Sequence, residues 1–236
     1  MFGTSRRPDE APRVEGVEFV RLDLNDGDSI EALGGLLKGV DILVNNAGES
    51  QSGPFEDLPL DAVHRLFQTN VFGAVRLTQL ALPGMRERGF GRVVMVGSML
   101  ASFPLAYRSS YVAAKAALRG FATAARYELS PFGVWLTTVE PGSIRTGISE
   151  RRTNFIAGDS VHRQGFDTIL AALNSNERNG APVGKVSRTI ADAIAADRPK
   201  PFYAVGSRAP FVFALRRLVP RSTAERVIQR RHGIRV

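Results

Sequence analysis

The sequence predicts an α/β fold of the doubly wound kind, a parallel sheet with helices on both faces, and two observations predict it. Strand-like apolar runs alternate with helical stretches along the chain, and these runs are continuously apolar, as in strands covered on both faces. The chain has 236 residues, 44% of them hydrophobic, which suffices for one sizeable core, and no repeat or low-complexity block divides it. We therefore expect a single domain over residues 1–236.

The individual elements are expected from these runs in chain order. Strands are expected at residues 17–22, 40–44, 92–96, 134–139 and 202–205, where β-prone apolar residues cluster. Helices are expected from Ser29, over about residues 61–87, from Ser110 to about Leu129, and near residues 187–196, where apolar periodicity is helical. Ser109 and Ser110 favour a helix start, and Pro131 ends the helix that follows.

Tyr111 and Lys115 carry the strongest chemical signal in the chain. Four residues apart on a helix, they share one face with Cβ atoms about 5–6 Å apart, and a nearby cation favours the phenolate that exchanges protons with a carbonyl or alcohol oxygen. Ser98 follows the strand expected at 92–96, at the sheet edge where open α/β sheets bind ligands. The alternative is a surface Tyr/Lys pair and a serine in a turn. Taken together, the three residues predict an oxidoreductase.

Further motifs stand in register with this triple. The expected strand at 40–44 runs into Asn45-Asn46-Ala47-Gly48, Asn70 lies in a helical stretch, and the run at 134–139 leads into Pro141-Gly142 and Thr146. In order and spacing these motifs make the chain similar to the short-chain dehydrogenase/reductase family over nearly its whole length. Each segment alone also reads as an ordinary turn or a structural amide. The resemblance implies a Rossmann-like sheet and a nicotinamide cofactor.

The resemblance also implies a role for each matching residue. Tyr111 would be the general acid in carbonyl reduction and the base in alcohol oxidation, with Lys115 holding the nicotinamide ribose. Ser98 would hydrogen-bond the substrate oxygen, and Asn70 would help to hold a water in the proton relay. The residues implied to lie along the cofactor are Asn45, Ala47, Gly48, Tyr111, Lys115, Pro141, Gly142 and Thr146.

One departure from the family concerns the cofactor's pyrophosphate. A site for that group needs a strand, then a glycine-rich turn, then a helix N-terminus, and the sequence contains no segment with these three features in that order. The opening residues from Phe2 resemble the family's second strand, so we expect a first βα unit of about 30 residues to be missing ahead of Met1. Its strand would be the central one, and its absence would leave two strand edges unpaired. A start placed too far downstream, or a fragment, is favoured over a functional minimal protein.

The turn after that opening strand predicts the cofactor type. Arg6 and Arg7 lie where the adenosine ribose would sit, and guanidinium groups there suit a 2′-phosphate, which favours NADPH over NADH. The alternative is a solvated turn in an arginine-rich chain. Asp23 and Leu24 match the family's pair of residues beside the adenine.

The amino-acid composition limits which other kinds of site and partner are expected. The chain lacks cysteine, which excludes disulfides and suits a cytoplasmic location, and its three histidines are scattered, so no metal site is expected. It has no apolar run long enough for a membrane span and no signal-peptide pattern. Eight arginines and one glutamate between Arg208 and Val236 give this tail a net charge of +7 out of +8. The basic tail fits a peripheral membrane contact, a solvated face, a dimer contact or a cover for the substrate cleft, and nucleic-acid binding is not expected.

The segment at about 147–183 falls where the family's variable substrate lid lies. Apolar residues expected to line a cleft there are Ile148, Phe155, Ile156, Phe166, Ile169 and Leu170. We therefore expect a small apolar carbonyl or alcohol as substrate, an NADP(H)-dependent interconversion of the two, and a homo-oligomer if the domain is complete. The alternative is a truncated or non-catalytic remnant of the fold without a competent cofactor site.

Overall fold

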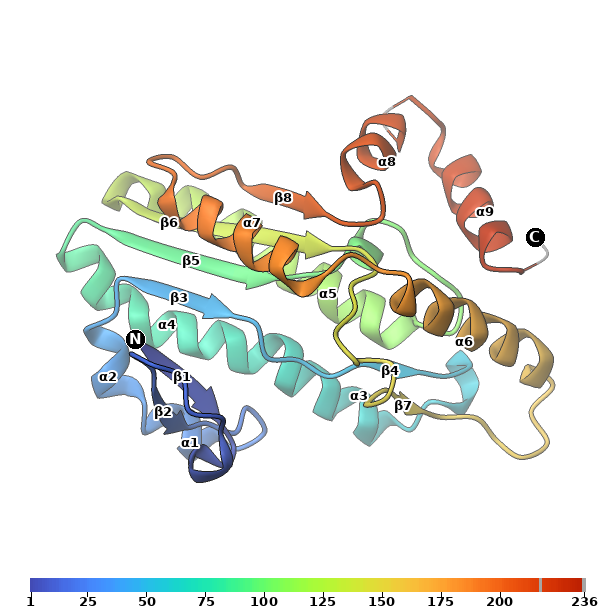
Figure 1. Ribbon diagram of the computed structural model, residues 1–236, viewed down its shortest axis with the longest axis horizontal. Coiled ribbons are helices and arrows are strands. Elements are labelled where there is room, and N and C mark those ends of the chain that lie inside the picture. Colours follow the sequence, from blue (N-terminus) through green and yellow to red (C-terminus); the bar gives the residue numbers. More distant parts are fainter. Residues whose placement is uncertain (217, 235–236) are drawn as a thin grey trace.

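The computed structural model describes residues 1–216 and 218–234, and its centre is a parallel sheet (Figure 1). The sheet has the order β3-β5-β6-β8, formed by β3 (Ile42–Asn45), β5 (Gly91–Val96), β6 (Val134–Pro141) and β8 (Phe202–Val205). All six residues of β5 are buried, because this strand is paired on both edges and covered on both faces. The expected α/β fold with a parallel sheet is confirmed. Arg217 and Arg235 of the expected basic tail lie outside the described residues.

Helices cover both faces of this sheet, and the alternation of side chains along β5 shows how. Val93 and Met95 lie in one core cluster with residues of α4 (Gly73–Glu87) and α5 (Ser109–Leu129). Val94 points the other way and packs with Val139, Val205 and apolar residues of α7 (Val183–Ala195). Figure 1 shows α7 on one side of the sheet and α4 and α5 on the other.

A second, separate pair of parallel strands holds the amino-terminal residues. It consists of β1 (Phe2–Ser5) and β2 (Glu18–Arg21), paired with each other only. In the described part of the chain, no ladder joins β1 to β3. Phe2 is 45% exposed, Ile42 44% and Val44 38%, although these are strand residues of apolar type. Within the described residues, β1 and β3 each pair with one strand only, and the strand expected between them stays a prediction.

The remaining elements surround these two sheets. They are η1 (Pro8–Glu10), α1 (Gly27–Glu31), α2 (Gly34–Lys38), β4 (Gln51–Ser52), η2 (Phe55–Asp57), α3 (Leu60–Phe67), the π-helical segment η3 (Gln68–Phe72), η4 (Met99–Ala101), η5 (Ser130–Phe132), β7 (Thr153–Asn154), α6 (Arg163–Arg178), α8 (Ala209–Arg216) and α9 (Arg221–Arg231). Among the described helices, none has the length and apolar character that crossing a bilayer requires.

Several boundaries differ from the sequence prediction for local reasons. The first helix begins at Gly27 rather than Ser29, because the Asp26 carboxylate caps it by accepting hydrogen bonds from the backbone N–H groups of Asp28 and Ser29. Helix α5 begins at Ser109, as predicted, but Arg108 is its N-cap, and the Ser110 hydroxyl donates to Gln51 Oε1 at 3.1 Å. The segment expected to form the lid contains β7 and α6.

Candidate active site

Helix α5 presents Tyr111 and Lys115 on one buried face. Tyr111 is 8% exposed and Lys115 5%, and the lysine Nζ lies 5.8 Å from the centroid of the tyrosine ring. The ring packs with Leu66 and Val71, which belong to α3 and the π-helical segment. The phenol is therefore held by packing from a neighbouring helix, and the cation lies beside it.

The carboxyl end of β5 fixes the lysine and places the serine. Lys115 Nζ donates to the carbonyl oxygen of Val96 at 2.9 Å, which ties α5 to the last residue of the strand. Ser98 follows two residues later, is buried, and caps η4 by accepting the Leu100 N–H at 3.2 Å. That bond uses an oxygen lone pair, so the Ser98 O–H proton remains available to a substrate oxygen.

Asn70 lies on the π-helical segment and reaches the turn after β3. Its Oδ1 accepts the Glu49 N–H at 2.7 Å, and its Nδ2 donates to the Glu49 carbonyl at 3.0 Å. A Cβ atom built on Gly48 would lie 3.0 Å from Asn70 Oδ1 and 3.6 Å from Lys115 Nζ. Gly48, Asn70 and Lys115 therefore converge at one point of the sheet edge. Wide π turns occur often at functional sites, and helical periodicity gives no warning of one.

Arg108 is a further buried group beside the tyrosine. Its guanidinium carbon lies 4.3 Å from the Tyr111 ring centroid, and its Nη atoms donate to the hydroxyls of Ser50 and Ser52 at 2.9–3.1 Å. Burial disfavours the charged form and lowers the pKa of Arg108 to about 10. The sequence analysis missed this residue, although its position three residues before Tyr111 was a usable signal.

The lid contributes a second buried arginine to this region. Arg152 Nη2 lies 3.7 Å from a carboxylate oxygen of Glu177, and Arg152 Nη1 donates to Asn174 Oδ1 at 2.8 Å. Burial lowers the pKa of Arg152, and Glu177 partly offsets this by favouring the charged form. No sequence signal joins Arg152 to Glu177, because their pairing depends on how α6 packs over the loop.

The structure separates the residues expected along the nicotinamide half of the cofactor into two groups. Ala47 and Gly48 are exposed at the end of β3, next to Lys115 and Asn70. The Asn45 side chain instead points into the protein, donating to Thr78 Oγ1 at 3.0 Å, and its buried Oδ1 has no hydrogen-bond donor within the described residues. Asn45 thus anchors β3 to α4.

The segment after β6 depends on a close approach of two turns. The Gly142 N–H donates to the Val205 carbonyl at 2.8 Å, and any side chain at Gly142 would clash with Ser207. Pro141 is the last residue of β6, and Thr146 is exposed farther along, where its hydroxyl donates to Glu177 Oε1 at 3.4 Å. This turn therefore requires glycine for packing, besides any contact with a cofactor.

The residues expected near the adenosine half of the cofactor differ in how exposed their side chains are. The Leu24 side chain lies in the core at 7% exposure, against Gly73, and its place beside the adenine stays a prediction. Asp23 is half-buried, and its Oδ1 accepts the Asn25 N–H at 3.0 Å. Arg6 and Arg7 are exposed directly after β1, and Arg7 pairs with Glu10 at 3.1 Å.

Lys115 and Asn70 are the residues that could hold a nicotinamide ribose, and glycine at position 48 lets the turn after β3 approach them closely, because a Cβ there would lie 3.0 Å from Asn70 Oδ1. The pyrophosphate has no such counterpart. None of the described residues forms a strand, a glycine-rich turn and a helix N-terminus in the gap between β1 and β3.

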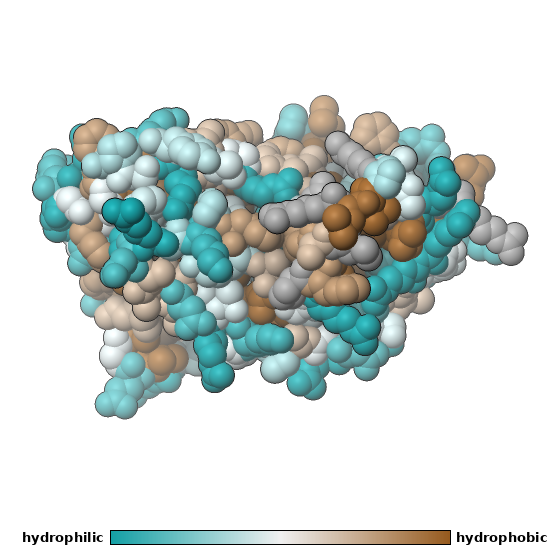
Figure 2. All heavy atoms as spheres, turned by 90° about the horizontal axis from the view of Figure 1, so that it is seen from above, coloured by the Kyte–Doolittle hydropathy of each residue, from teal (hydrophilic) through white to brown (hydrophobic). Residues whose placement is uncertain are grey.

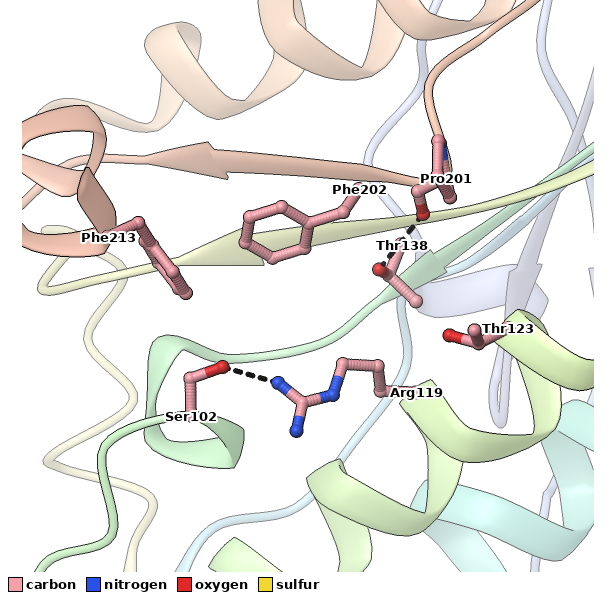
Figure 3. A pocket seen from close by; sticks show the side chains of 7 residues that line it. All are labelled: Ser102, Arg119, Thr123, Thr138, Pro201, Phe202 and Phe213. Atoms are coloured by element: carbon pink, nitrogen blue, oxygen red, sulfur yellow. Dashed lines mark hydrogen bonds between the residues drawn. The ribbon is translucent and has the colours of Figure 1, made fainter. Parts of the chain in front are cut away.

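A separate cavity lies under α8, on the next turn of α5. Its volume is about 340 Å³, and its lining includes Phe202, Phe213, Thr138 and Arg119 (Figure 3). Arg119 donates to the Ser102 hydroxyl and lies 3.6 Å from the fully buried carboxylate of Glu140. The lining contains none of the predicted catalytic residues.

Comparison with known proteins decides the family. The model of the short chain dehydrogenase family matches residues 9–156. This chain belongs to the short-chain dehydrogenases. It is 31% identical over 251 aligned residues to YusZ of Bacillus subtilis, an uncharacterized oxidoreductase, covering 98% of this chain and 89% of YusZ. The family assignment makes it an oxidoreductase of a class that uses NAD(P)-type cofactors.

Other relatives align with different shares of this chain. Retinol dehydrogenase 8 of Homo sapiens is 39% identical over 53% of this chain and 41% of its own length. The 3-ketodihydrosphingosine reductase of Bacteroides thetaiotaomicron is 27% identical over 91% of this chain and 81% of its own length.

Solved structures agree with the fold. A short-chain dehydrogenase from Streptomyces avermitilis superimposes with a TM-score of 0.80 at 28% identity, covering 96% of this chain and 86% of that one. A closed serine dehydrogenase with bound NADP+ has a TM-score of 0.68 at 25% identity, covering 86% and 80% of the two chains.

Proposed function

We propose that this protein interconverts a carbonyl and an alcohol with NADP(H), and that Tyr111 is the general acid and base. The observation that carries the proposal is the convergence of Lys115 and Asn70 on Gly48, one helical turn from Tyr111. Ser98, at the end of the same strand that holds Lys115, completes the set. Membership of an oxidoreductase family supports this assignment over a binding module.

The chemistry assigns one task to each side chain. NADPH, when bound, would supply a hydride to the carbonyl carbon. The Ser98 hydroxyl donates a hydrogen bond to the carbonyl oxygen, and the Tyr111 phenol transfers its proton to that oxygen, so that an alcohol and a tyrosinate result. Lys115 holds the nicotinamide ribose and stabilises the tyrosinate by its charge. Asn70 keeps the turn at Glu49 open and helps to hold the water that returns a proton to Tyr111.

Two observations support the finer parts of this proposal. Exposed Arg6 and Arg7 after β1 suit a 2′-phosphate, and a structural relative at 25% identity holds NADP+. An apolar substrate fits the half-buried Ile148, Phe155 and Ile156 of the lid and the names of relatives, which specify retinol and 3-ketodihydrosphingosine. Phe166 and Ile169 belong to the packed interior instead, at 2% and 0% exposure.

Replacing Tyr111 with Phe tests the proposed acid. With NADPH and a panel of apolar aldehydes and ketones, kcat is expected to fall by about 10²–10⁴-fold, the contribution of a positioned general acid. Tyr127→Phe is the matched control, because Tyr127 lies on the same helix at 74% exposure and its variant should retain wild-type turnover. Wild-type turnover in Tyr111→Phe would refute the assignment. If neither the wild type nor the control oxidises NADPH, the result would favour the non-catalytic remnant.

A further inference from the structure

The α8–α9 hairpin, formed by residues 209–231, extends beyond the body of the sheet (Figure 1). It lies in the segment from Arg208 to Val236, which contains eight arginines and one glutamate. A net charge of +7 out of +8 is thus concentrated in the last 29 residues of the chain. The reaction proposed above makes no use of this charge.

The inner face of the hairpin is fixed to the region of the active site. Phe213 on α8 contacts Phe103 and Phe202 edge-on, with ring centroids 4.9 Å apart in each pair, and Figure 3 shows Phe202 and Phe213 side by side. Gln229 on α9 donates to the Pro104 carbonyl and accepts the Ala106 N–H, both at 3.1 Å. Phe103, Pro104 and Ala106 lie between Ser98 and Tyr111 in the chain, so the hairpin is held against the segment that joins these two proposed catalytic residues.

The outer face exposes large apolar side chains next to arginines. Phe211 is 67% exposed, Leu218 83% and Val227 58%. The exposed arginines on the same segment are Arg208, Arg226, Arg230 and Arg231. Figure 2 shows hydrophobic side chains gathered over the hairpin beside a hydrophilic band. Apolar side chains surrounded by guanidinium groups suit a partner that is apolar inside and anionic at its surface.

We propose that the outer face of the α8–α9 hairpin binds the surface of bilayers that contain anionic phospholipids. Phe211 and Leu218 insert among the acyl chains, and the arginines pair with headgroup phosphates. A second copy of this face is a poor partner, because two surfaces of the same positive charge repel. Nucleic acid would engage the arginines and leave the apolar side chains in water.

This placement brings the bilayer next to the active site. The hairpin's inner face contacts Pro104 and Ala106, so its outer face lies one helix layer from the segment that leads to Tyr111. A substrate dissolved in the membrane would then reach the site without crossing bulk water. Binding itself is a property of the surface and does not depend on the proposed reaction.

Sedimentation with vesicles tests the proposal directly. The chain is expected to sediment with mixed vesicles of phosphatidylcholine and phosphatidylglycerol, and to remain in solution with phosphatidylcholine alone. Salt should release it, because the Debye length shrinks to about 3 Å at 1 M. Each arginine near an anionic surface contributes about fivefold to the partition coefficient, so Arg226→Gln/Arg230→Gln/Arg231→Gln should lower it by about 100-fold. Phe211→Ser/Leu218→Ser should lower it by at least about tenfold.

Matched control variants test whether binding to vesicles depends on this surface, rather than on positive charge or exposed apolar side chains anywhere on the protein. Arg13→Gln/Arg21→Gln/Arg86→Gln removes three exposed arginines elsewhere, and Phe132→Ser removes a phenyl ring that is 50% exposed on η5. Both controls should bind vesicles like the wild type, and thermal unfolding should show that every variant is folded. Failure of the wild type to bind mixed vesicles would overturn the proposal, as would full binding by either hairpin variant. Retention by DNA without binding to vesicles would assign the surface to nucleic acid instead.

Discussion

The regions proposed to hold the nicotinamide and the adenosine of the cofactor differ in how the described residues build them. At the nicotinamide end, Lys115, Asn70 and Gly48 converge, and the polar groups contact one another or the backbone. At the adenosine end, no ladder joins β1 to β3 in the described part of the chain, and Phe2, Ile42 and Val44 are 38–45% exposed. The proposed catalytic residues come from α5, the turn after β5 and the π-helical segment, so none of them lies on β1 or β2.

The largest expected difference between the two regions concerns the affinity for the cofactor. We expect residues 1–236 to bind NADPH at least about 10³-fold more weakly than a chimera in which a family member's first strand, glycine-rich turn and helix precede Met1. Each charge-assisted hydrogen bond to the pyrophosphate contributes about 1.5–3 kcal/mol, and the turn supplies several. Calorimetric titration of both proteins measures the difference. Micromolar binding by residues 1–236 alone would mean that another segment holds the phosphates.

A second prediction concerns the joint between the two regions, where α4 passes the end of α2. Any side chain at Gly84 would overlap the Lys38 carbonyl oxygen, which also accepts a hydrogen bond from Arg88. Gly84→Ala is therefore expected to lower the free energy of unfolding by about 1–3 kcal/mol or more, as overpacking does. Gly120→Ala is the control, because nothing lies within 4 Å of its Cβ position on α5.

The control variant should change in the opposite direction. Gly120→Ala is expected to raise the free energy of unfolding by about 0.5–1 kcal/mol, since alanine loses less backbone entropy in a helix than glycine. Thermal or urea unfolding measures both variants. Equal effects of the two substitutions would show that the α2–α4 approach is loose and that the two regions are not rigidly joined.

The smallest expected effect concerns Arg6 and Arg7, which lie in the region proposed to hold the adenosine. In an active enzyme, the double substitution to alanine should lower the ratio of kcat/KM for NADPH to that for NADH by about 10–100-fold, through lost bonds to the 2′-phosphate. The Arg7–Glu10 pair already engages one guanidinium, so Arg6 is expected to carry the larger share. An unchanged ratio would identify the two arginines as a solvated turn.

Sequence patterns predicted the parts of this protein that depend on local order. The continuous apolar runs predicted the sheet, and the four-residue spacing predicted that Tyr111 and Lys115 share a face of α5. The patterns could not reveal the buried Arg152–Glu177 pair, which forms only when α6 folds over the lid. The packing of the Leu24 side chain against Gly73 is likewise a contact between distant residues that the patterns do not reveal.

The π-helical segment at Gln68–Phe72 determines what the loss of one residue at this point of the protein would change. Each residue of an α-helix turns the chain by about 100°. A π turn holds one residue more than a regular helical turn and absorbs it locally, so deleting one residue from this segment would leave α3 and α4 nearly in phase. The deletion would instead remove the wide turn that presents Asn70 to Glu49 and packs Val71 against Tyr111. The extra residue therefore shapes the turn after β3 while leaving the packing of α4 against the sheet unchanged.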